Sequence, residues 1–245
     1  MTNKYIYFIA NWKMFGGLNS LNSINKVVKF LNNFKKKRFT KIIYCPPNTL
    51  INQMSINLRK SQIEVGAQNC HENYGYGAYT GSINSLMLKN AGAKYVIIGH
   101  SEIRNIGETN KKINLKIKSA LKTGLKVIFC IGETLQEKRK KITKSVLNKQ
   151  IKLGLAKIHD KKNIIIAYEP VWSIGSGLIP NQKELFTTID FIKKKLKNYK
   201  VIYGGSVNPK NISQLKSINN LDGFLVGGAS QDSKKFIDII KKTYN

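Results

Sequence analysis

The sequence predicts an α/β protein, a closed (β/α)8 barrel of eight parallel strands ringed by helices. Short, nearly continuous apolar runs rich in Ile and Val recur along the chain, and longer lysine-rich segments with helical spacing lie between them. Continuous apolar runs are typical of strands that are covered on both faces, as in parallel sheets. About eight alternations of strand and helix favour a closed barrel, with an open doubly wound sheet as the second candidate.

The apolar runs mark the expected strands. In chain order they are Tyr5–Ala10, Ile42–Cys45, Ile63–Ala67, Tyr95–Gly99, Val127–Cys130, Ile164–Tyr168, Val201–Tyr203 and Gly223–Val226. Apolar stripes at helical spacing lie between them, and two examples are Ile113, Ile117, Ala120 and Leu121, and Phe186, Ile189, Ile192 and Leu196. No linker or composition break divides the chain, so we expect one catalytic barrel domain over residues 1–245.

The chain of 245 residues carries a net charge of +29, which has two interpretations. A strongly basic protein can bind nucleic acid or another polyanion. We favour a compositional origin, because the basic runs lie late in expected helices, where they complement the helix dipole. These runs are Lys35–Arg38, Lys193–Lys195 and Lys241–Lys242. Aromatic residues are not interleaved with them, so we expect no specific nucleic-acid partner.

Three cysteines, Cys45, Cys70 and Cys130, form no C-x-x-C pair, which argues against a disulfide framework and a zinc site. No stretch approaches the roughly 20 apolar residues of a membrane span. The first apolar run is too short for the core of a signal peptide. We therefore expect a cytoplasmic protein with no membrane partner.

Polar residues that follow the expected strands are the candidate catalytic groups, because such barrels place their active sites at the carboxyl ends of the strands. Lys13 follows the first run, His100 the fourth and Glu169 the sixth. A single lysine or histidine is more often a surface or structural residue, and we interpret His71 and His159 as surface residues. Three such groups at strand ends together favour one site.

The segment after Glu169 is an expected lid. It begins at Pro170, is punctuated by glycine, and carries Trp172 and Ile174, which we expect to be exposed. An ordinary barrel loop would explain the glycines but not the two large apolar residues. A loop of this kind can close over a site and exclude water, which strengthens a carboxylate as a base.

Glycine-rich turns follow the last two runs, at Gly204–Ser206 and at Gly227–Ser230. Glycine lets backbone N–H groups approach an anion, and turns after strands seven and eight form the recurrent phosphate site of these barrels. Either turn alone has a plain structural explanation, but the pair favours phosphate. No metal-ligand cluster or nucleotide fingerprint occurs. The expected chemistry is proton abstraction next to a carbonyl of a small phosphorylated substrate.

Five segments together resemble the triosephosphate isomerase family, in the family's order and spacing. They are Asn11-Trp12-Lys13, Gly99-His100-Ser101-Glu102, Tyr168-Glu169-Pro170-Val171-Trp172, Tyr203-Gly204-Gly205-Ser206-Val207 and Leu225-Val226-Gly227-Gly228-Ala229-Ser230. The resemblance covers essentially Tyr5 to Ser230. It implies a TIM barrel that interconverts dihydroxyacetone phosphate and D-glyceraldehyde 3-phosphate in glycolysis and gluconeogenesis, with no cofactor and no metal.

The resemblance also implies a role for each catalytic residue. Glu169 is the base that shuttles a proton between two substrate carbons, and His100 is the neutral electrophile that polarises the carbonyl oxygens. This family is itself the standard example of such tuning and of lid closure. Lys13 and Asn11 stabilise the enediolate oxygens.

Supporting and binding roles follow from the same resemblance. Ser101 holds Glu169 in the open state, and Glu102 pairs with Lys13. Backbone N–H groups bind the phosphate, and they belong to Gly175, Ser206, Gly227 and Gly228. Binding energy from this remote phosphate can drive lid closure and so speed the reacting end.

The family is typically a homodimer, and the segment Tyr74–Ser85 resembles its interdigitating loop. By this resemblance Thr80 reaches the partner's Asn11 and the partner's Lys13. A monomer would then be a poor catalyst.

Three positions depart from the family pattern. Ser82 and Ile103 stand where the family usually carries a Glu and an Arg that pair across the interface, so we expect a dimer held more by apolar contact. Pro180 ends the lid and has no N–H. In the family a tyrosine, here Tyr203, usually bonds an N–H at that position when the lid closes. This chain cannot form that bond, so we predict that Tyr203→Phe is nearly silent.

Three other functions compete with this interpretation. The first is a different sugar-phosphate isomerase or lyase on the same barrel, since fold does not determine function. The second is a nucleic-acid-binding protein with salt-dependent affinity. The third is a catalytically inactive scaffold. The lid and strand-end motifs argue against the first, scattered lysines against the second, and the presence of Lys13, His100 and Glu169 against the third.

Overall fold

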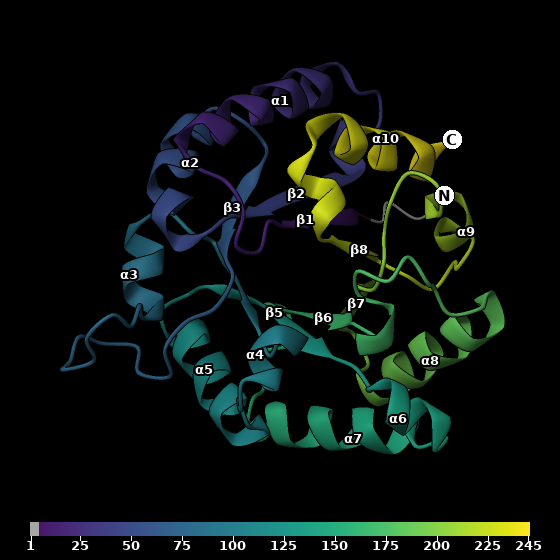
Figure 1. Ribbon diagram of the computed structural model, residues 1–245. Helices are drawn as coiled ribbons and strands as arrows, with labels where there is room; N and C mark the ends of the chain where they lie inside the picture. The colour runs from purple at the N-terminus through teal and green to yellow at the C-terminus, as the bar shows by residue number, and fades with distance from the viewer. Residues whose placement is uncertain (1–4) are drawn as a thin grey trace.

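The computed structural model describes residues 5–245, and residues 1–4 of the expected domain lie outside the described part of the chain. Strands and helices alternate along the chain (Figure 1). The strands are β1 (Ile6–Asn11), β2 (Thr40–Cys45), β3 (Glu64–Ala67), β4 (Tyr95–Ile98), β5 (Lys126–Ile131), β6 (Ile164–Tyr168), β7 (Lys200–Tyr203) and β8 (Gly223–Val226). The helices are α1 (Ile24–Asn33), α2 (Ile51–Leu58), α3 (Ser85–Asn90), α4 (Ser101–Asn105), α5 (Asn110–Lys122), α6 (Leu135–Arg139), α7 (Thr143–Gly154), α8 (Gln182–Lys195), α9 (Ile212–Lys216) and α10 (Ser233–Tyr244).

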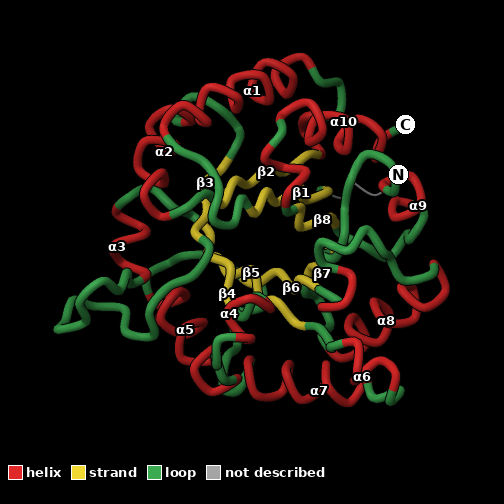
Figure 2. The backbone as a smooth tube through the Cα atoms, viewed as in Figure 1, coloured by secondary structure: helices red, strands yellow, loops and turns green. Residues whose placement is uncertain are grey.

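The strands form a closed parallel barrel. Each strand pairs with the next along the chain, and β8 pairs with β1 through partners such as Ile9 and Leu225. Figure 2 shows the strands as an inner ring with the helices around it. The predicted fold class is confirmed, and the open doubly wound sheet is excluded. Every strand begins and ends within two residues of its expected run.

The strands are buried on both faces, which explains why their sequences are continuous apolar runs. In β1, Ile9 belongs to an inner cluster with Ile128 and Leu225, whereas its neighbours Phe8 and Ala10 belong to the larger cluster that includes the helices. This alternation follows from the period of two along a strand. The inner cluster fills the barrel below the site, so the strand ends are held rigidly.

The predicted core stripe is correct for α5 and partly wrong for α8. In α8, Ile189 and Ile192 are buried, but Phe186 is 44% exposed and Leu185 is buried in its place. Positions 185, 189 and 192 have the i, i+4, i+7 spacing of one helix face, which excludes position 186.

The basic runs lie at the ends of helices or just beyond them. Lys193–Lys195 and Lys241–Lys242 lie in the last turns of α8 and α10, as predicted. Lys35–Arg38 lies beyond the end of α1, because the extended backbone of Phe34 ends that helix first. Within residues 5–245, no helix combines the length and the apolar character needed to cross a bilayer.

Candidate active site

A cavity of about 210 Å³ lies where the loops after the barrel strands converge. The four predicted catalytic residues line it, namely Asn11, Lys13, His100 and Glu169. The four predicted phosphate-binding residues also line it, namely Gly175, Ser206, Gly227 and Gly228. The fold therefore brings together groups as far apart in the sequence as Asn11 and Gly228.

Lys13, just beyond the carboxyl end of β1, adopts an uncommon backbone conformation with φ of +56°. Non-glycine residues rarely adopt a left-handed conformation, and it persists where the surroundings over-determine it. Here the Lys13 N–H donates to Asn11 Oδ1 at 3.1 Å, and Gln68 Nε2 donates to the Lys13 carbonyl at 2.8 Å. The Lys13 ammonium donates to Glu102 Oε1 at 2.5 Å. Lys13 is thus held from three sides.

His100 caps α4 and faces the carboxylate of Glu169. Its Nε2 lies 3.5 Å from Glu169 Oε1. Its Nδ1 accepts the backbone N–H of Glu102 at 3.3 Å. In a neutral imidazole one nitrogen accepts and the other donates, so this contact leaves the proton on Nε2, toward the cavity.

Glu169 ends β6 inside the protein and is only 2% exposed. Burial raises the pKa of its carboxyl above the ordinary glutamate value, and His100, the Cys130 thiol, Lys13 and the Ser101 N–H oppose this shift. Among the described residues, its Oε2 has no hydrogen-bond partner. A buried carboxylate oxygen without a partner is costly and needs an explanation, and at the wall of a cavity a substrate can supply the partner.

The glycines after β7 and β8 serve two different purposes. A side chain at Gly204 would lie 2.8 Å from Glu169 Cγ, and one at Gly205 would lie 2.3 Å from the Tyr203 hydroxyl. At Gly228, nothing lies within 4 Å of such a side chain. Gly204 and Gly205 are therefore glycine because Glu169 and Tyr203 pack against them, whereas Gly228 leaves open space beside it for an anion.

The lid, residues 170–180, is anchored at its start to a buried carboxylate, Glu133. Trp172 Nε1 donates to Glu133 Oε1 at 2.9 Å, and the Tyr168 hydroxyl donates to both carboxylate oxygens at 3.1 and 3.2 Å. The Lys138 ammonium lies 3.6 Å from the centroid of the Trp172 ring. Burial raises the pKa of Glu133. We did not predict this residue, although it comes soon after β5, separated from it by Gly132, and Glu169 comes directly after β6.

Two expectations about exposure are wrong. Trp172 and Ile174 are half-buried, because the lid folds back onto the barrel rim. His71 is also half-buried, because its ring packs against the ring of Tyr79, with centroids 4.5 Å apart and planes tilted by 38°. His159 is exposed, as predicted.

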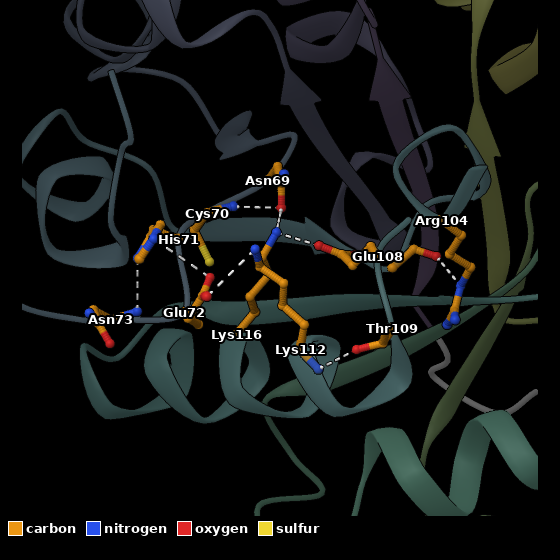
Figure 3. Close-up of polar contacts among 11 residues, drawn as sticks. Asn69, Cys70, His71, Glu72, Asn73, Arg104, Glu108, Thr109, Lys112 and Lys116 are labelled. Carbon is orange, nitrogen blue, oxygen red and sulfur yellow. Dashed lines mark hydrogen bonds and ion pairs between the residues drawn. The ribbon is translucent and has the colours of Figure 1, made fainter. Parts of the chain in front are cut away.

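A buried ion pair supports the long loop after β3, and the sequence analysis missed it. Lys116 of α5 pairs with Glu108 and donates to Asn69 Oδ1 at 2.9 Å (Figure 3). Both charged groups are almost fully buried. Nearby, Lys112 lies 3.6 Å from Glu72. The sequence feature that could have indicated this pair is Lys116, because it lies next to Ile117 of the buried stripe of α5.

Residues 71–82, which we call the projecting loop, extend away from the barrel (Figure 1). Thr80 and Ser82 are exposed on this loop, and Thr80 does not line the cavity of its own chain. Ile103 is half-buried and lines a groove beside the cavity, together with Met14 and His100. A single chain therefore brings together the predicted site residues except Thr80.

Comparisons with known proteins agree with this geometry. Residues 6–243 match the family model described as triosephosphate isomerase. Triosephosphate isomerase of Thermodesulfovibrio yellowstonii is 39% identical, over 98% of this chain and 100% of the relative, and that of Dictyoglomus thermophilum is 41% identical, over 95% and 97%. The crystal structure of triosephosphate isomerase from Bartonella henselae matches with a TM-score of 0.89 and 33% identity, over 98% of this chain and 99% of that one. The chain belongs to the triosephosphate isomerase family.

Proposed function

We propose that this protein interconverts dihydroxyacetone phosphate and D-glyceraldehyde 3-phosphate by moving one proton between adjacent carbons through an enediolate. Membership of the family supports this reaction and its place in glycolysis and gluconeogenesis. The observation that carries the proposal is Glu169, a buried carboxylate with a raised pKa and one oxygen without a partner. Such a group is a base poised for a proton that the substrate supplies.

Proton transfer requires groups that stabilise the oxygens as charge develops. Glu169 takes the proton from the carbon that bears the hydroxyl, the C–H electron pair becomes the C=C bond of the enediolate, and the carbonyl π pair moves to its oxygen. Glu169 then returns the proton to the former carbonyl carbon, and the hydroxyl proton passes to the former carbonyl oxygen. His100 donates from Nε2 to the substrate oxygen. The Lys13 ammonium offsets the negative charge. Asn11 accepts the Lys13 N–H through Oδ1, so its amide nitrogen is the group that donates to the substrate.

The phosphate group is assigned to the turns that line the cavity on the lid, after β7 and after β8. The open space at Gly228 supports this assignment, as does the φ of +70° at Gly175, which glycine adopts without strain. The N–H donors are those of Gly175, Ser206, Gly227 and Gly228. The Ser206 N–H also donates to Ser173 Oγ, so the phosphate and Ser173 would share it. The proposed reaction is assigned no cofactor and no metal.

We also assign the protein to a homodimer in which the projecting loop of one subunit fills the groove beside the cavity of the other. Met14 in this groove is 99% exposed, and Tyr76 on the loop is 76% exposed. Large apolar groups of this kind mark interaction surfaces. Ile103 supplies an apolar wall in place of a charge, and Thr80 would reach the partner's Lys13.

The chain is assigned to one catalytic domain in the cytoplasm. The pairing of β1 with β8 and the family match over residues 6–243 support a single unit. The cysteines are free and buried, which fits a reducing compartment.

The direct test is the isomerisation of D-glyceraldehyde 3-phosphate, coupled to a dehydrogenase, with chelator present. We expect kcat/KM near the diffusional ceiling of about 10⁸ M⁻¹s⁻¹, which this family is itself known to approach. Glu169→Gln is the control that identifies the site. A folded wild-type dimer with no turnover would overturn the proposal and direct attention to other sugar phosphates.

A further inference from the structure

One hydroxyl group of the lid connects parts of the site that lie far apart in the sequence. Ser173 is fully buried, although it lies in a surface loop. Its Oγ lies 2.5 Å from the Leu178 carbonyl, 2.9 Å from the Tyr203 hydroxyl and 3.3 Å from the backbone nitrogen of Ser206. These partners are the far end of the lid, the end of β7 and the turn after β7.

The three contacts use the full hydrogen-bonding capacity of a serine hydroxyl. A hydroxyl has one proton to donate and two lone pairs that accept. The Leu178 carbonyl can only accept, so Ser173 donates there. Ser173 therefore accepts from the Tyr203 hydroxyl and from the Ser206 N–H. No other arrangement satisfies all three partners.

We propose that Ser173 is a positioning residue that latches the lid over the cavity, and that Tyr203 acts on the lid through it. The proposal rests on the proposed function, since the lid matters only if the cavity holds the substrate. It revises the expectation that Tyr203→Phe is nearly silent. That expectation assumed a hydroxyl without a lid partner, and the structure gives it one.

The position of Ser173 explains how a latch acts on catalysis. Ile174 and Gly175, the lid residues that line the cavity, follow it directly. Pro180 has no N–H, so it cannot donate a hydrogen bond to Tyr203 from the end of the lid. Leu178, near that end, instead accepts a hydrogen bond from Ser173 through its carbonyl. Ser173 in turn accepts one from the Tyr203 hydroxyl. Through the Ser206 N–H, the same hydroxyl joins the lid to the proposed phosphate turn.

The test compares Ser173→Ala with wild type on two substrates, D-glyceraldehyde 3-phosphate and phosphate-free glyceraldehyde. We expect kcat/KM for the phosphorylated substrate to fall about 10- to 100-fold, because the buried Tyr203 hydroxyl loses its partner on the lid. For glyceraldehyde we expect a change below about threefold, since that substrate gains little from phosphate-driven closure.

A double-mutant cycle tests the link to Tyr203. We expect Tyr203→Phe to lose activity about 10-fold alone, and almost nothing further in the Ser173→Ala background. Ser176→Ala is the matched control, because Ser176 lies in the same lid and its hydroxyl bonds only to backbone of the lid itself. It is expected to change kcat/KM less than about threefold.

Several outcomes would overturn the latch. Equal losses on both substrates would indicate a general structural defect, and additive losses in the cycle would mean that Tyr203 acts elsewhere. If Ser173→Ala is as active as an active wild type, the latch is refuted and the proposed function still holds. If Ser173→Ala melts below the assay temperature, Tyr203→Phe with the two substrates carries the test, because it removes the same contact from the barrel side.

Discussion

The lid and the projecting loop are both surface segments that follow barrel strands, but they differ in how far their side chains are buried against the barrel. In the lid, Trp172 and Ser173 bond to the barrel rim and are half or fully buried. In the projecting loop, Tyr76 and Thr80 are exposed and contact little of their own chain. The comparison teaches that the contacts of the lid are completed within one chain, whereas the exposed groups of the projecting loop support the proposal that a second copy of the chain covers them.

The largest expected effect tests the chemistry that the lid covers. Glu169→Gln should lower kcat/KM about 10³- to 10⁴-fold, because it removes the base without changing the shape of the site. Its melting temperature should not fall, since burial disfavours the ionised carboxylate.

Glu133→Gln is the matched control, because Glu133 is a buried carboxylate that accepts bonds from Tyr168 and Trp172. It should lower the melting temperature more than Glu169→Gln and activity less. Equal activity losses in the two variants would contradict the assignment of Glu169 as the catalytic base.

The second prediction compares a glycine that packs against the strand end before the lid with a glycine of the projecting loop. A side chain at Gly132 would lie 1.8 Å from the Glu169 carbonyl oxygen, whereas nothing lies within 4 Å at Gly75 of the projecting loop. Gly132→Ala should lower the free energy of unfolding by about 3 kcal/mol, and Gly75→Ala by less than about 0.5 kcal/mol. Denaturant titration measures both. Similar values would mean that the strand end at Glu169 is not tightly packed.

The third prediction addresses the partner of the projecting loop. Tyr76→Glu should weaken self-association at least about 10-fold, because a charge would enter an apolar interface. Activity should fall in parallel as the dimer dissociates on dilution. Phe186→Glu is the control, because Phe186 is also an exposed aromatic residue. It belongs to α8, which lies across the barrel from the projecting loop (Figure 1). Sedimentation that shows a fully active monomer would refute the dimer.

The smallest expected effect concerns pH. The raised pKa of Glu169 predicts that the acid limb of kcat/KM lies above the ordinary glutamate value of about 4.3, because the base must be ionised to act. The native state then holds this proton more tightly than the unfolded chain does. Between the ordinary and the raised pKa, Glu169 therefore makes stability fall as pH rises. A pH–rate profile on the free enzyme measures the limb, and a limb at or below the ordinary value would contradict the prediction.

The sequence by itself determined the barrel and the place of the candidate catalytic groups in it. The apolar runs of strands and the apolar stripes of helices are local patterns that can be read from neighbouring residues. Residues that directly follow the strands of such a barrel lie at its active-site end, so their place in the sequence predicts their place at the cavity. Lys13, His100 and Glu169 were therefore predictable from the residues next to them. Glu133 was accessible by the same rule and was overlooked.

Only the tertiary structure decided what surrounds these groups. The burial of Glu169, the packing of Gly205 against Tyr203, the Lys116–Glu108 pair and the contacts of Ser173 each depend on distances between segments far apart in the chain. The sequence shows a serine in a loop but does not show whether its hydroxyl faces water or bonds to three buried partners. Its neighbours in space, and the low dielectric around them, decide which of these it is.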